Sequence, residues 1–143
     1  MALNLNKRDL RQFMRYIVVG VLNTLVTLAV IFLCKSLLDV NIWVSNALGY
    51  VAGVLNSFIW NKLWVFQSGS KAYRSEALRF MIGFLVCYVL QFVVTWILNS
   101  MLGGLEIDLW VTVISGYGVA TLVGMVVYTL GNFVYNRAVT FKN

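Results

Sequence analysis

The residues in this chain whose types and spacing favour chemistry are basic side chains at the ends of long uncharged runs, two of them beside asparagines. Lys62 follows Asn61, and Arg137 follows Asn136. Guanidinium and ammonium groups bind phosphate oxygens, and a neighbouring amide adds neutral N–H donors. The pattern predicts phosphate binding, although positive flanks also occur on membrane proteins for topology alone. The residues predicted to bind phosphate are Arg15, Lys62, Arg79, Arg137, Asn61 and Asn136.

A second group of polar residues lies inside the uncharged runs. Amides in apolar surroundings cost free energy unless they are hydrogen-bonded. They therefore either line a polar groove between helices or bond one another where helices pack, and both interpretations stay open. The members of this group are Asn23, Asn46, Asn56 and Gln91.

Groups that catalysis or metal binding would require are missing from the uncharged runs, which contain no Asp, Glu, His, Lys or Arg. Cys34 and Cys87 have no neighbour at metal-ligand spacing and are interpreted as small buried hydrophobic residues. No catalytic residue, metal site or cofactor is predicted, and the chain is predicted not to be an enzyme. A proton-coupled carrier is also disfavoured, because it would need an ionisable group within the bundle.

The elements that position these residues are four uncharged runs, each long enough to cross a bilayer. The chain has 143 residues, of which 61% are hydrophobic and 11% charged, and this composition excludes a soluble domain. The sequence predicts an all-α membrane protein with four transmembrane helices. The runs are Tyr16–Cys34, Val40–Asn61, Phe80–Leu105 and Leu109–Asn136.

Charge asymmetry sets the expected orientation. Ten of the eleven basic residues precede the first run, lie between the second and third, or follow the fourth, and only Lys35 lies on the other side. Basic loops stay in the cytoplasm, so both termini and the central loop are predicted to be cytoplasmic. The net charge of +6 comes from these short clusters, which do not form a nucleic-acid footprint.

The sequence also repeats itself. An offset of 75 residues aligns residues 55–66 with 130–141, with Asn61 on Asn136 and Lys62 on Arg137. Both halves begin and end on the predicted cytoplasmic side, which indicates two parallel helical-hairpin repeats. We predict one membrane domain over residues 1–143, with an interfacial leader at 1–14, repeats at 15–66 and 79–141, and a cytoplasmic loop at 67–78.

Several motifs together resemble a known family. They are Arg15-Tyr16-x-x-Val19-Gly20-x-x-Asn23-Thr24, Asn46-x-Leu48-Gly49-Tyr50, Ser57-Phe58-x-x-Asn61-Lys62-x-Trp64-Val65-Phe66 and Arg79-Phe80. The chain resembles the GtrA-like family of small four-helix membrane proteins over nearly its whole length. The second repeat departs more, because Val139 stands where the first repeat has Trp64.

The resemblance implies a multi-pass protein of the bacterial inner membrane that acts in cell-surface polysaccharide or O-antigen modification. It would flip a polyprenyl-phosphate-linked sugar from the cytoplasmic to the outer leaflet by facilitated diffusion. The sugar hydroxyls would contact Asn23, Asn46, Asn56 and Gln91, unless these amides bond one another. The expected partners are polyprenyl phosphate or its glycosylated form and membrane lipid. The alternative is a lipid-carrier-binding scaffold for a partner membrane glycosyltransferase. A small multidrug-type exporter is less favoured, because the cytoplasmic cations would repel cationic substrates.

Oligomeric state stays open at this point. Four short helices enclose little volume, and the stripes of small residues fit either internal packing or the interface of a homodimer with a shared lipid path.

Overall fold

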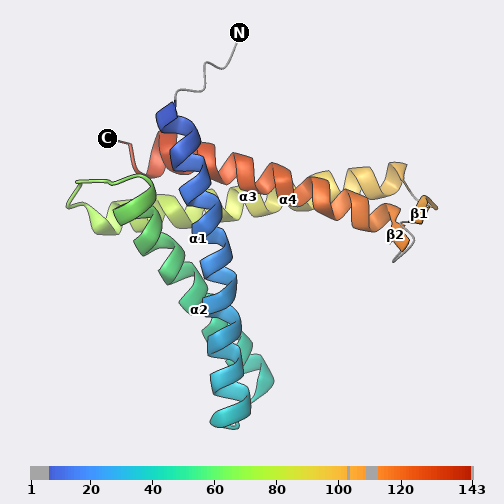
Figure 1. The fold of residues 1–143 in the computed structure, drawn as a ribbon, viewed down its shortest axis with the longest axis horizontal. Coiled ribbons are helices and arrows are strands. Elements are labelled where there is room, and N and C mark those ends of the chain that lie inside the picture. The colour runs from blue at the N-terminus through green and yellow to red at the C-terminus, as the bar shows by residue number, and fades with distance from the viewer. Residues whose placement is uncertain (1–6, 103, 109–112, 143) are drawn as a thin grey trace. The chain divides into compact units, whose positions relative to one another are not determined.

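The computed structural model describes residues 7–102, 104–108 and 113–142. Four long helices account for most of these residues (Figure 1): α1 (Lys7–Phe32), α2 (Ile42–Trp60), α3 (Tyr73–Met101) and α4 (Gly116–Tyr135). Within the described ranges these four helices, with the turns that extend three of them, are long and apolar enough to cross a membrane. The predicted all-α fold with four transmembrane helices is confirmed.

The chain divides into two compact units, of which the first ends at Lys71 and the second runs from Ala72 to Lys142. In the first unit α1 packs along α2, and in the second α3 packs along α4, so each unit is a helical hairpin (Figure 1). Large apolar side chains are exposed along all four helices, among them Leu25, Val51, Phe92 and Val126. Such surfaces need lipid as their solvent.

Glycines let the two helices of the first unit approach closely. A Cβ placed on Gly49 would lie 2.9 Å from the main-chain oxygen of Thr27 and 2.5 Å from Cγ1 of Ile31. A Cβ on Gly53 would meet the hydroxyl of Thr27 and the main-chain oxygen of Asn23. The α1–α2 contact therefore depends on side chains that are absent at these two positions.

The second unit repeats this contact with different partners. A Cβ on Gly124 would meet Thr95 and would lie 3.2 Å from the main-chain oxygen of Gln91. Gly124 lies 75 residues after Gly49, whereas Gln91 and Thr95 lie 64 residues after Thr27 and Ile31. The same packing pattern thus occurs in both hairpins, and the offset grows because the connection between the helices is longer in the second.

Three helices end in a single π turn, in which the chain takes one more residue than an α turn. These turns are Leu33–Leu37 after α1, Asn61–Val65 after α2 and Asn136–Thr140 after α4. We call the last two the exit turns, and they coincide in the 75-residue repeat. The amide of Phe66 bonds the oxygen of Asn61 at 2.9 Å, and that of Phe141 bonds Asn136 at 2.8 Å.

Two of these turns are closed by the same backbone device. Gln67 adopts a φ of 52°, and the next amide, that of Ser68, bonds the oxygen of Lys62 at 2.9 Å. Asp39 adopts a φ of 49°, and the amide of Val40 bonds the oxygen of Cys34 at 2.9 Å. A left-handed residue just past the helix end satisfies carbonyls that would otherwise lack a partner, as in glycine caps of α-helices.

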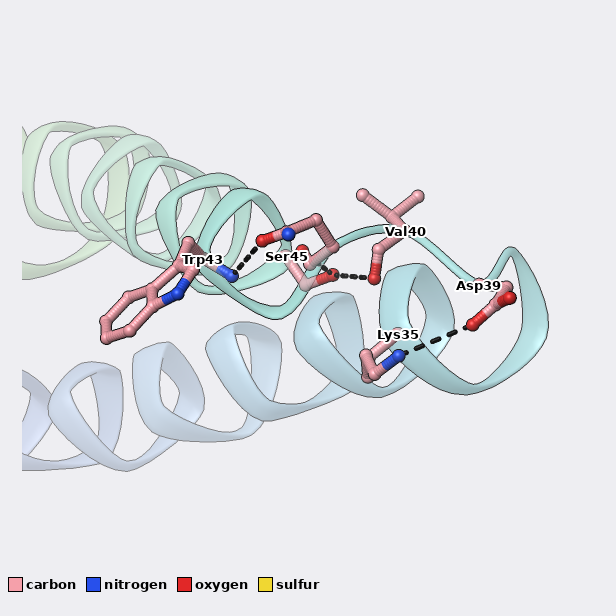
Figure 2. Close-up of polar contacts among 6 residues, drawn as sticks. Lys35, Asp39, Val40, Trp43 and Ser45 are labelled. Atoms are coloured by element: carbon pink, nitrogen blue, oxygen red, sulfur yellow. Dashed lines mark hydrogen bonds and ion pairs between the residues drawn. The ribbon is translucent and has the colours of Figure 1, made fainter.

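The connection between α1 and α2 is held by local polar contacts (Figure 2). The side-chain oxygen of Asn41 accepts the amide of Trp43 at 2.9 Å and caps the start of α2. Ser45 donates to the oxygens of Val40 and Asn41 at 3.3 and 3.0 Å. Lys35 and Asp39 form an exposed ion pair at 3.4 Å. The chain therefore reverses direction within a few residues.

The connection between α3 and α4 differs from the sequence expectation. Glu106–Asp108 (β1) and Val113–Ser115 (β2) form a short antiparallel ladder, and α4 begins only at Gly116. The uncharged run predicts a helix that begins at Leu109. Val113 and Ile114 are β-branched and favour extended backbone, so absence of charge alone overestimates the helix here.

Two helices, α1 and α3, instead start before their uncharged runs. α1 begins at Lys7 and is continuous through residues 7–14 of the segment predicted as a leader. Residues 1–6 of that segment lie outside the described residues. α3 begins at Tyr73, within the segment 67–78 predicted as a loop. Charged residues occupy these extra turns, because helices longer than the bilayer core reach into the headgroup region.

Candidate functional site

Arg15, near the start of α1, is fixed on the exit turn of the first unit. Its Nη1 donates to the main-chain oxygen of Trp64 at 3.1 Å, and its guanidinium lies 5.3 Å from the centre of the Trp64 ring. Arg15 is half-buried, and Tyr16 beside it is buried. One helix start is thereby tied to the end of its hairpin partner.

Arg79, near the start of α3, makes the corresponding contact in the second unit. Its Nη1 donates to the main-chain oxygen of Val139 at 3.4 Å. Val139 lies 75 residues after Trp64, and Arg79 lies 64 residues after Arg15, the offsets found for the helix packing. Phe80, the counterpart of Tyr16, packs on Phe141 with ring centres 6.3 Å apart.

These contacts use only a small part of each guanidinium. A guanidinium has five N–H donors in a planar fork. Within the ranges that the structure describes, Arg15 and Arg79 make no further hydrogen bond or ion pair. Each arginine is held in position by one bond and keeps donors with the geometry that phosphate oxygens require.

The basic residues of the two exit turns differ in exposure. Lys62 is buried, with 2% of its surface exposed, and its ammonium donates to the main-chain oxygen of Ser70 at 2.8 Å. Its repeat counterpart Arg137 is exposed. Lys62 therefore fastens the segment after its turn, whereas Arg137 presents its charge at the surface.

Asn61 and Asn136 are the most deeply buried residues of the predicted set, with 1% and 0% of their surface exposed. The amide nitrogen of Asn61 donates to the main-chain oxygen of Ser57 at 2.8 Å, and that of Asn136 donates to the side-chain oxygen of Asn132 at 3.3 Å. The predicted N–H donors are thus already bonded within their own helices.

The predicted groove residues Asn23 and Asn56 lie together in the first unit. The amide nitrogen of Asn56 donates to the side-chain oxygen of Asn23 at 2.7 Å, and its oxygen accepts the indole N–H of Trp60 at 3.0 Å. At the corresponding places of the second unit, the sulfur of Cys87 lies near Gly131, and the ring of Tyr135 lies against Gly83. The polar chain is specific to the first hairpin.

The other two predicted groove residues do not join this chain. Asn46 donates to the oxygen of Ile42 on its own helix at 2.9 Å. Gln91 packs beside Gly124 in the second unit. Both side chains are half-buried.

Sequence reasoning missed the atoms to which the cations are tied. The oxygens of Trp64, Val139 and Ser70 belong to the main chain, so no residue type announces them. It also missed Glu76, a carboxylate with 4% exposure in the first turn of α3, where the helix dipole favours negative charge. The signal in the sequence that could have located these contacts is the repeat itself, in which Arg79 follows Arg15 by 64 residues and Val139 follows Trp64 by 75.

Two hydrophobic helical hairpins, each with an arginine tied to a π turn, define a multi-pass membrane protein built by internal repetition. Residues 15–141 match the family model described as the GtrA/DPMS transmembrane domain, and the chain belongs to this family.

Two relatives match over almost the whole chain. The chain is 28% identical to the "Uncharacterized membrane protein YngA" of Bacillus subtilis (strain 168) over 137 residues, which cover 96% of the chain and 86% of the relative. It is 26% identical to the "Cell wall teichoic acid glycosylation protein GtcA" of Listeria innocua serovar 6a (strain ATCC BAA-680 / CLIP 11262) over 137 residues, covering 94% and 87%.

Proposed function

We propose that this protein acts in cell-surface glycosylation by flipping a polyprenyl-phosphate-linked sugar from the cytoplasmic to the outer leaflet of the bacterial inner membrane. The family match supports a membrane role, and the relative named for teichoic acid glycosylation supports the link to surface polymers. The protein has no catalytic role in this proposal, and glycosyl transfer belongs to other proteins.

The observation that carries the proposal is the arginine at the start of the first helix in each hairpin. Arg15 and Arg79 are held by one main-chain carbonyl each and have donors left over for a phosphate. Charge-assisted N–H bonds to phosphate are about twice as strong as neutral ones. Arg137 adds exposed positive charge beside the second exit turn, and Lys62 adds a buried positive charge beside the first.

The sugar would then contact amides deeper in the helices. Asn23 lies two helical turns beyond Arg15 along α1, and its amide nitrogen makes no hydrogen bond within the described ranges. With Asn56 it offers polar contacts to sugar hydroxyls, and Asn46 and Gln91 complete the set proposed from the sequence. The isoprenoid tail stays in lipid, against the apolar outer faces of the helices.

Movement needs no coupling ion in this scheme. The uncharged runs contain no titratable carboxylate, imidazole or ammonium. Synthesis of the lipid-linked sugar on one side and its consumption on the other supply the gradient, so transport is facilitated diffusion.

The test is leaflet-to-leaflet movement of a polyprenyl-phosphate-linked sugar in vesicles that contain only this protein. An Arg15→Ala/Arg79→Ala variant is compared with an Arg8→Ala/Arg11→Ala variant, which loses two exposed cations from the same end of α1. We expect movement to be lost in the first variant and kept in the second. Equal movement in the wild type and both variants, or wild-type movement no faster than in empty vesicles, would contradict the proposal.

The second candidate is a scaffold that binds the lipid carrier for a membrane glycosyltransferase. The family model is described as a transmembrane domain, and a domain of that kind could hold the lipid carrier for an enzyme without moving it. Tight, arginine-dependent binding without movement in these vesicles, with co-purification of a glycosyltransferase, would support the scaffold.

A further inference from the structure

The side-chain oxygens of Asn61 and Asn136 are buried and unbonded. Neither Oδ1 finds a hydrogen-bond partner among the residues that the structure describes. The two asparagines open the two exit turns and are equivalent in the repeat. An unpaired buried acceptor costs free energy, so its presence at both positions indicates a use outside the fold.

The orientation of the Asn61 amide follows from its neighbour. The main-chain oxygen of Ser57, 2.8 Å away, accepts hydrogen bonds and donates none. The atom facing it is therefore the amide nitrogen, which fixes the unpaired atom as the oxygen. In the second unit Asn132 is the repeat counterpart of Ser57, and its side-chain oxygen accepts a hydrogen bond from the amide nitrogen of Asn136.

The chemistry of the missing partner is restricted by this orientation. An amide oxygen accepts from O–H or N–H groups, whereas an ionised phosphate has none to offer. A free cation is disfavoured, because each asparagine is followed by a fixed positive charge, Lys62 or Arg137. The ammonium of Lys62 is directed to Ser70. A neutral O–H or N–H donor satisfies these conditions, and the hydroxyl is the commonest such donor on a sugar.

We propose that the side-chain oxygens of Asn61 and Asn136 each accept a hydrogen bond from a hydroxyl of the glycan on the lipid carrier, and so distinguish the glycosylated carrier from bare polyprenyl phosphate. This inference rests on the proposed function and changes the role of the two asparagines from phosphate donors to hydroxyl acceptors. Because both oxygens are covered, the side chains over them must part by the width of a hydroxyl when the glycan binds.

The test is equilibrium binding in nanodiscs of phosphatidylcholine, whose headgroup contains no O–H or N–H donor. Three labelled probes are compared: polyprenyl phosphate, its hexose ester, and an alkyl hexoside without phosphate. The proteins are the wild type, an Asn61→Leu/Asn136→Leu variant and a Ser57→Ala variant. Ser57→Ala is the control, because it removes the 3.2 Å contact between the serine hydroxyl and the amide nitrogen of Asn61 but leaves the Asn61 side-chain oxygen in place.

We expect the wild type and the Ser57→Ala variant to bind the hexose ester about tenfold more tightly than the bare carrier, the scale of one or two hydrogen bonds. In the double-leucine variant this ratio falls to about one, with bare-carrier binding unchanged. An unchanged ratio would mean that the oxygens hold only internal water. Equal loss of both lipids would mean that the asparagines serve the phosphate or the fold. Either result overturns the inference.

The alkyl hexoside separates this inference from the proposed function. If the wild type binds neither phosphate lipid, the proposed function fails, and asparagine-dependent binding of the hexoside still supports the hydroxyl contact. Hexoside binding that is absent or independent of the asparagines overturns it. Phosphatidylglycerol is added as a competitor, and displacement of the hexoside by it would assign the contact to a headgroup hydroxyl in place of a glycan.

A second readout does not depend on the double-leucine variant, which could fail to fold. In wild-type protein with ¹³C-labelled asparagine, the alkyl hexoside should shift two side-chain carbonyl signals, one of which disappears in Asn136→Leu alone. No shift at saturating hexoside would contradict the proposal without relying on the double variant.

Discussion

Arg15 and Trp64 are joined twice, by a 3.1 Å hydrogen bond to the main-chain oxygen and by a cation–π contact to the ring. The first contact fixes the backbone of the exit turn, and the second fixes the plane of the guanidinium. Arg79 repeats only the first contact, because Val139 has no ring to stack on. The two hairpins thus hold their arginines by a shared backbone bond and differ in the side chain below it.

Arg15→Ala is expected to destabilise the first hairpin by about 1–2 kcal/mol, because it loses one charge-assisted bond and one cation–π contact. Arg15→Lys should recover part of this, since an ammonium can donate to the same oxygen but fits the ring less well. The measurement is unfolding in mixed micelles. Arg8→Ala, an exposed site on the same helix, is the control, and an equal loss there would refute the assignment.

Gly49→Ala is expected to destabilise the protein by about 1–3 kcal/mol, the usual cost of overpacking. The new methyl group would lie 2.9 Å from a main-chain oxygen, which cannot move without shifting α1. Gly20→Ala is the matched control, because nothing lies within 4 Å of its Cβ position. It should be neutral or raise stability by up to about 1 kcal/mol through helix propensity. Similar effects at both glycines would argue against the close α1–α2 contact.

Gln67→Gly is expected to raise stability by about 0.5–1 kcal/mol, because glycine adopts a φ of 52° without the Cβ clash of other residues. Gln67→Ala, which shortens the side chain but keeps the clash, should give no gain. Thermal unfolding of the three proteins in one detergent decides the matter. A gain in the alanine variant as large as in the glycine variant would show that the side chain, and not the backbone, is responsible.

Asn23 and Asn56 are expected to be coupled by about 0.6–2 kcal/mol in a double-mutant cycle of leucine substitutions, the range found for hydrogen bonds between membrane helices. Each single variant leaves the other amide without its partner across the 2.7 Å contact. A cycle between Asn23 and Asn46, which bonds only its own helix, should show coupling near zero. Comparable coupling in both cycles would contradict the pairing.

The four transmembrane helices were largely predictable from the sequence, since a run of about 20 uncharged residues is what crossing a bilayer requires. The pairing of Asn23 with Asn56 followed one of the two interpretations of the buried amides. The π turns were not predictable, because an extra residue in one turn leaves hydropathy unchanged. The β1–β2 ladder was missed because Val113 and Ile114 are as apolar as a membrane helix.

The candidate site was predictable in residue type and less so in role. The cations at Arg15 and Arg79 are predictable from their positions at the ends of uncharged runs, but their carbonyl partners are main-chain atoms with no sequence signature. Which atom of the Asn61 amide is bonded depends on a side-chain rotation, and only the position of the Ser57 carbonyl shows that it is the nitrogen.

The π turn at Asn61 and its twin at Asn136 contain the same extra residue at the same place, each approached by an arginine from the neighbouring helix. An insertion shared in this way is most simply inherited from one ancestral hairpin that already had it before the gene was duplicated. Each compact unit contains its own arginine and its own exit turn, so the contact between the two needs nothing from the other hairpin. The polar chain of Asn23, Asn56 and Trp60, present in one hairpin only, marks where the two halves have diverged from each other.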